Sequence, residues 1–183
     1  MTNKEEACSV IEYSDFLFEN ELVSVIALRK SPKIDLIGLS VGPFEENQEY
    51  EVRFWIAREL EKDGIVRVRG EILDATKLYK IQWTERIQAV GQLSTLPENF
   101  YPRLRRLIND LKAASKASPE KMREYEYVHN LSQDIVNCRL KKILSLASLT
   151  MHESQILKKL TPEEREIYER IRQIIIDWKS KII

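Results

Sequence analysis

The first 72 residues contain short apolar runs separated by turn residues. Two runs rich in Val, Ile and Leu occupy Leu22–Leu28 and Ile34–Val41, and the turn signals Ser31-Pro32 and Gly42-Pro43 follow them. Runs of β-branched residues bounded by such turns are typical of strands. They predict a hairpin whose turn is centred on residues 30–33.

A further strand–helix–strand pattern follows this predicted hairpin. Residues 50–54 read as a short strand, a helix then places Trp55, Ile56 and Leu60 on one face, and residues 65–69 return as a strand. Gly64 falls just past the helix, where positive φ is favoured. The region is therefore expected to form a small strand-strand-helix-strand domain, after a short helical lead at residues 13–19. The core residues expected for it are Leu22, Val25, Leu36, Phe44, Trp55 and Leu60.

The rest of the chain has helical periodicity. Asp74 is a plausible N-cap, and apolar residues recur every three or four positions from Phe100 to Leu111. Ser118-Pro119 has the cap-then-proline order of a helix start. Thr161-Pro162-Glu163-Glu164 reads as a capping box. The predicted fold is α+β, with a small β-rich domain at residues 1–72 and a larger all-α helical-bundle domain at residues 73–183.

The helix that starts at Pro119 is apolar on two sides, and a final helix after Thr161 is apolar on one. An apolar arc this wide needs more than one neighbour, so a binding partner is expected to cover part of it and the chain is not expected to be a stable monomer. The interface residues predicted on this basis are Tyr125, Val128, Leu131, Ile135, Cys138, Leu140, Ile143, Ile171, Ile174 and Trp178.

Charge divides the chain in the same place. The 183 residues carry 29 basic and 29 acidic side chains, but residues 1–75 hold 9 basic and 16 acidic ones (net −7), which leaves 20 and 13 (net +7) for the remainder. Such asymmetry favours two domains and a polar partner, nucleic acid among the candidates, although ordinary solvated faces explain it equally well. No apolar run is long enough for a membrane span, and the acidic start is unlike a signal peptide. A cytoplasmic protein is expected.

Catalytic motifs are missing from the sequence. It has no GxGxxG, GxxxxGK[ST] or GxSxG pattern, and its two histidines, His129 and His152, lack metal-ligand spacing. Cys8 and Cys138 are far apart and are expected to be reduced. Basic groups such as Arg103, Arg105 and Arg106 are interrupted by acidic and apolar positions, so any DNA contact should be weak and non-specific. No enzyme activity, cofactor or metal is predicted.

Several segments, taken in order, carry a family resemblance. They are FLFENELVSVIAL, IDLIGLSVGPFEENQEYEVRFWIARELEKDGIVRV, ILDATKLYKIQWTER, FYPRLRRLI and RLKKIL. Their combination of E-L-V-x-x-I, a G-P-F before an acidic loop, and a W-[IL]-A helix resembles GINS subunits whose small β-rich domain precedes the helical one, the archaeal type in particular. The resemblance covers roughly the first 150 residues.

This resemblance implies a non-catalytic, nucleoid-associated subunit of the DNA-replication GINS complex. It implies pairing with a GINS subunit whose helical domain comes first, in a 2:2 tetramer that associates with the MCM helicase and a RecJ-like partner. Primase or polymerase are further candidate partners. The alternative is a stand-alone winged-helix-like DNA-binding regulator, which is less favoured because the strands lie in the acidic half of the chain, where a wing would need positive charge.

Overall fold

A computed structural model describes residues 2–70, 72–89, 92–149 and 154–183. The chain divides into two compact units, Asp15–Ile72 and the combination of Met1–Ser14 with Leu73–Ile183. The elements in chain order are α1 (Thr2–Glu19), β1 (Leu22–Ala27), β2 (Ile34–Leu36), β3 (Leu39–Val41), β4 (Glu49–Arg53), α2 (Phe54–Lys62), β5 (Val66–Val68), α3 (Ala75–Ile87), α4 (Phe100–Ala114), α5 (Pro119–Ser148), α6 (Ser154–Leu157) and α7 (Pro162–Ile182).

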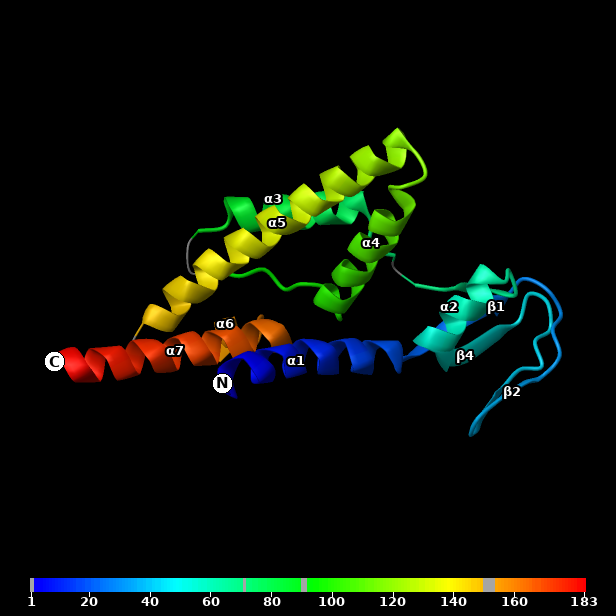
Figure 1. Cartoon of the computed structure of the whole chain (residues 1–183), viewed down its shortest axis with the longest axis horizontal. Coiled ribbons are helices and arrows are strands. Elements are labelled where there is room, and N and C mark those ends of the chain that lie inside the picture. The colour runs from blue at the N-terminus through cyan, green and yellow to red at the C-terminus, as the bar shows by residue number, and fades with distance from the viewer. Residues whose placement is uncertain (1, 71, 90–91, 150–153) are drawn as a thin grey trace. The chain divides into compact units, whose positions relative to one another are not determined.

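The order of these elements confirms the predicted fold class, a small strand-containing domain followed by a helical bundle (Figure 1). The division of the units differs from the expected 1–72 and 73–183 at one end only. Residues 1–14 group with the helical unit, and the Ser14 hydroxyl donates a 2.6 Å hydrogen bond to Glu163 Oε1 at the start of α7. The first helix is also longer than the predicted lead at residues 13–19, since it begins at Thr2.

Strand pairing in the small unit differs from the predicted hairpin. β1 is the central strand of an antiparallel sheet with the order β4-β1-β5, and Val25 pairs with Tyr50 on one side and Val68 on the other. Residues 34–41 instead fold back on themselves as a separate β2–β3 ribbon. Gly38, with a φ of 79°, occupies the turn between them, a conformation that residues with a Cβ rarely adopt. The predicted pairing of residues 22–28 with 34–41 is therefore wrong.

The small unit's core lies between the sheet and α2. Its buried residues are Val25, Ala27, Val41, Phe44, Val52, Ile56, Ala57, Leu60, Ile65 and Val66. Val25, Phe44 and Leu60 were among the expected core residues. Gly64, at a φ of 66°, ends α2 as predicted, and the Ile65 amide donates to the Leu60 carbonyl at 2.9 Å.

Three residues predicted for this core are exposed. Leu22 is 61% exposed because strand alternation turns it to the face opposite Val25. Leu36 is 37% exposed beside the turn of the β2–β3 ribbon. Trp55 is 39% exposed because the buried side of α2 is formed by Ile56, Ala57 and Leu60. These three positions are corrections to the sequence-based core.

The helical unit has two apolar clusters along α5. The first joins α3, α4 and the first half of α5 through residues that include Leu78, Leu104, Val128 and Ile135. The second joins the end of α5 to the region before α7 and to α7 itself through Ile143, Leu146, Ala147, Leu160 and Tyr168. Figure 1 shows α5 running alongside α3 and continuing towards α7.

Helix starts in this unit follow the predicted caps. The side chains of Asp74 and Ser118 accept hydrogen bonds from the backbone N–H groups of Lys77 and Lys121. Thr161 and Glu164 form the reciprocal capping box at the start of α7. Each cap satisfies N–H groups that a helix cannot pair internally, so the polar signals in the sequence fix where these helices begin.

Candidate subunit interface

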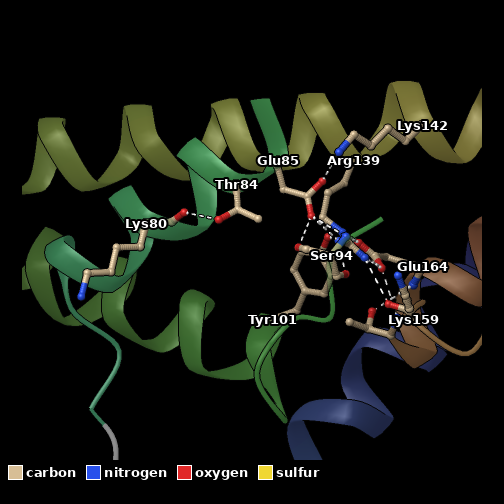
Figure 2. Close-up of polar contacts among 10 residues, drawn as sticks. Lys80, Thr84, Glu85, Ser94, Tyr101, Arg139, Lys142, Lys159 and Glu164 are labelled. Atoms are coloured by element: carbon tan, nitrogen blue, oxygen red, sulfur yellow. Dashed lines mark hydrogen bonds and ion pairs between the residues drawn. The ribbon is translucent and has the colours of Figure 1, made fainter. Parts of the chain in front are cut away.

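A buried ion cluster holds the helices of the helical unit in register (Figure 2). Arg139 on α5 donates from Nη1 to Glu85 Oε1 of α3 at 2.7 Å and from Nη2 to Glu164 Oε2 of α7 at 2.6 Å. Lys142, one turn further along α5, donates to Glu85 Oε2 at 2.6 Å. The side chains of Arg139 and Glu85 are 0% exposed and that of Glu164 is 3% exposed. Three helices therefore meet at one charged centre.

Further polar groups complete this cluster. Arg139 Nε also bonds Glu164, and the guanidinium donates to the carbonyls of Ser94 (3.0 Å) and Lys159 (3.3 Å). The hydroxyl of Tyr101 on α4 donates to Glu164 Oε1 at 2.7 Å, and the Ser94 hydroxyl donates to Glu85. Buried charges are tolerated only when paired and hydrogen-bonded in this way. The cluster thus also fixes the segments that precede α4 and α7.

The electrostatics of the cluster favour an architectural role. Burial opposes ionisation of Glu85, but the hydrogen bonds from Lys142 and Ser94 and the nearby Arg139 charge outweigh it, so the pKa of Glu85 is lowered. Burial likewise opposes the charge on Arg139, but the bonds and charge of Glu164 raise its pKa. Burial and the Glu164 charge raise the pKa of Tyr101. These groups are paired with one another and with Glu164 inside the helical unit, as expected of a cluster that stabilises a fold.

Two rows of apolar side chains on the helical unit are exposed. On α5, Val136, Leu140 and Leu144 are 40%, 37% and 43% exposed, and they follow one another at four-residue spacing. On α7, Ile174, Trp178 and Ile182 have the same spacing and are 65%, 62% and 67% exposed. Residues four apart lie on one helix face, so each row is a continuous apolar strip. Strips of this kind on a surface are typical of protein–protein contact sites.

The structure separates the predicted interface residues into two groups. Leu140, Ile174 and Trp178 belong to the exposed rows. In contrast, Val128, Leu131, Ile135 and Ile143 are at most 6% exposed inside the chain's own clusters, so their prediction as contact residues is wrong. The helices α3, α4 and α7 cover most of the α5 surface that was expected to need a partner, but they leave the row with Leu140 exposed. Tyr125, Cys138 and Ile171 are partly buried.

The sequence analysis did not predict the residues of the buried ion cluster. Arg139 and Lys142 lie four and seven residues after Ile135, so they share its buried face. Charged residues at core spacing were the available signal. Their partners Glu85 and Glu164 are 54 and 25 residues away from Arg139, and no local pattern pairs them.

His129 is partly buried, with its ring 5.6 Å from that of Tyr125, whereas His152 lies outside the described residues. Among residues that the structure describes, no group of three or more His, Cys, Asp or Glu side chains could hold a metal ion. In the same part of the chain, no helix combines the length and apolar character of a membrane span.

The fold and the exposed rows define a class of protein, a two-domain subunit of a protein assembly. It has a small strand-containing domain and a helical bundle that contains a buried ion cluster and carries exposed apolar rows. Comparison with known proteins agrees with that class. A family model described as the PSF2 N-terminal domain matches residues 11–69, and one described as the GINS complex protein helical bundle domain matches residues 72–183. The chain belongs to the GINS helical-bundle family, with a PSF2-type N-terminal domain.

Two relatives are GINS subunits with the same name. "DNA replication complex GINS protein PSF2" of Homo sapiens is 29% identical over 147 residues, which are 80% of this chain and 75% of the human protein. Its counterpart from Xenopus laevis is 30% identical over 130 residues, 70% of this chain and 66% of that protein. The resemblance to GINS subunits with the small domain first is confirmed, and these two relatives are eukaryotic.

Proposed function

We propose that this chain is a non-catalytic subunit of a GINS complex that acts in DNA replication. The observation that carries the proposal is the pair of exposed apolar rows on α5 and α7, in a chain whose relatives are named as subunits of such a complex. Water-exposed strips of Leu, Ile and Trp cost free energy in an isolated chain, and a second subunit would cover them. The partner is a GINS subunit whose helical domain comes first.

The finer features of the proposal are those of the archaeal type. The complex is a 2:2 tetramer that bridges the MCM helicase and a RecJ-like partner at the fork, with primase or polymerase as further partners, in a nucleoid-associated cytoplasmic location. DNA contact is secondary, because scattered Lys and Arg side chains give only sequence-independent binding. The small domain at residues 1–72 and the helical domain at 73–183 are proposed to fold separately, with subunit contacts made mainly by the helical domain.

Assembly is tested by co-expression with a helical-domain-first GINS subunit and measurement of the complex mass. Leu140→Glu and Trp178→Glu should each keep the helical fold and reduce the assembled fraction, because a charge in the strip would be desolvated on binding. Tyr127→Glu is the matched control, since Tyr127 lies on α5 at 50% exposure and about 140° around the helix axis from Leu140. Normal assembly of both row variants would contradict the placement of the interface.

Function is tested by DNA unwinding. MCM helicase is assayed with and without the assembled complex, and duplex binding by the complex alone is measured at several salt concentrations. We expect stimulated unwinding and weak, salt-sensitive DNA binding. Tight, sequence-selective binding near physiological salt would favour the stand-alone regulator, and nucleotide turnover by the complex without helicase would refute a non-catalytic role.

A further inference from the structure

A third exposed strip, besides the α5 and α7 rows, lies on α3. Tyr79, Trp83 and Ile87 are 48%, 56% and 67% exposed and follow one another at four-residue spacing. We refer to these three residues as the α3 aromatic face. The opposite side of the same helix carries the buried Leu78 and Glu85. Trp and Tyr are the side chains most enriched among residues that dominate binding energy, so this face has the composition of a contact site.

The α3 aromatic face and the α5 row point in different directions. Gln82 and Arg86 of α3 bond Asp134 Oδ2 of α5 at 2.9 Å and 2.8 Å, which places Asp134 on the side of α5 nearest this face. At about 100° per residue, Val136, Leu140 and Leu144 lie about 160°, 120° and 80° around the α5 axis from Asp134. The α5 row is therefore on another side of α5, and a partner that covers it need not cover the α3 aromatic face.

The charges beside this face have one sign on α3. The only acidic residue of that helix is Glu85, which is buried and paired with Arg139 and Lys142. The exposed charged neighbours of Trp83 on α3 are Lys80 and Arg86. In Figure 2 the Lys80 ammonium extends away from the buried cluster. A partner with carboxylates beside its apolar anchors would complement this arrangement, because opposite charges steer and orient docking.

The same charges argue against two other occupants. A two-fold pairing of α3 with α3 of a second copy, centred on Trp83, would place Lys80 against the other copy's Arg86, and like charges in contact are unfavourable. Nucleic acid would stack on the aromatic rings, but it also needs several free cations along its backbone. Arg86 is already paired with Asp134 at 2.8 Å, and that carboxylate would repel phosphate.

We propose that the α3 aromatic face binds an acidic amphipathic helical segment of another protein. Its apolar side packs on Tyr79, Trp83 and Ile87, and its flanking carboxylates pair with Lys80 and compete with Asp134 for Arg86. An amphipathic helix presents apolar residues at three- and four-residue intervals, which matches the spacing of this face. The inference goes beyond the proposed function and does not depend on which subunit covers the α5 and α7 rows.

The test uses the full-length chain and three fluorescent 18-residue helical peptides. All three share one apolar strip; the first is flanked by Glu, the second by Lys, and the third has the composition of the first with its strip scrambled. Anisotropy should show binding of the Glu-flanked peptide at least tenfold tighter than that of the other two. Trp83→Ala should weaken it by tenfold or more, whereas Trp178→Ala, which removes an exposed tryptophan of α7, should leave it unchanged.

Charge reversal distinguishes specific docking from non-specific hydrophobic binding of the peptide. Lys80→Glu should weaken the Glu-flanked peptide about threefold or more and strengthen the Lys-flanked one. Equal binding of the Glu-flanked and scrambled peptides, or no response to Lys80→Glu, would overturn the proposal. Two other results would also overturn it. One is an oligo(dT) probe that binds more tightly than the acidic peptide and is weakened by Trp83→Ala; the other is self-association of the chain that Trp83→Ala abolishes. None of these outcomes affects the assembly test with Leu140→Glu, so the two proposals can fail separately.

Discussion

Replacing Arg139 by Met should destabilise the helical unit severely. Arg139 is 0% exposed and is the cation shared by Glu85 and Glu164. Removal of one partner from a buried ion pair costs about 3–5 kcal/mol, because the remaining charge is left uncompensated. Glu85 would still be paired with Lys142, so the loss is concentrated at Glu164, whose remaining bonds come from Tyr101 and the Thr161 amide. We expect a decrease of about 3–5 kcal/mol in the free energy of unfolding.

The assay is urea unfolding followed by circular dichroism at a helix-sensitive wavelength, which reports chiefly on the helical unit. Arg86→Met is the control: its ion pair with Asp134 has side chains 57% and 43% exposed, and such surface pairs contribute about 0–1 kcal/mol. The double variant Arg139→Met/Glu164→Gln should be more stable than Arg139→Met alone, because no unpaired carboxylate remains. An Arg139→Met chain as stable as the Arg86→Met chain would refute the reasoning.

Three further predictions concern the other features. Ile135→Glu should unfold the helical unit, by circular dichroism, whereas Leu140→Glu should preserve its helicity, because only Ile135 is fully buried; loss of helicity in Leu140→Glu would be the contrary result. Glu85 has a pKa lowered from its ordinary 4.5, so its contribution to stability is complete above that pH and is lost as the pH falls below it. Glu85→Gln should therefore flatten the acid limb of a plot of unfolding free energy against pH, and an unchanged limb would count against its role. Phe44→Ala should lower the unfolding free energy of the small unit by about 3–5 kcal/mol and leave the helical transition in calorimetry unchanged, a result that a simultaneous shift of both transitions would contradict.

Local signals in the sequence predicted the local structure well. The caps at Asp74, Ser118 and Thr161 depend on side chains within three residues of the N–H groups they satisfy, so the helix starts could be read directly. The α+β order of the domains followed from a change in hydrophobic period. Pairing between distant segments could not be read in this way. β1 pairs with β4 and β5, which come after the short β2–β3 ribbon in the chain, and no local pattern distinguishes that arrangement from a simple hairpin.

Periodicity also could not show what covers an apolar face. The apolar arc of α5 predicted a need for neighbours, but the chain itself supplies most of them, so Ile135 and Ile143 are core residues while Leu140 is exposed. Trp55 was assigned to the core because it was expected to share a helix face with Ile56 and Leu60, yet the buried side of α2 is formed by Ile56, Ala57 and Leu60. The sequence thus indicates that a helix is amphipathic, and only the packed structure shows which strip is left for a partner.

Glu164 couples the position at which α7 starts to the position at which α7 packs against α5. The same carboxylate closes the capping box with Thr161 and accepts the bonds of Arg139. Sliding α7 by a single residue would carry the capping box along but would break the bonds to Arg139, so both sets of bonds form together at one register of α7 against α5. Because the Lys159 carbonyl also accepts a bond from Arg139, an insertion between Lys159 and Glu164 would break part of this contact. An inserted residue between Thr161 and Tyr168 would rotate the apolar side of α7 by about 100° away from α5. Insertions and deletions during evolution are therefore expected to avoid the segment from Thr161 to Tyr168.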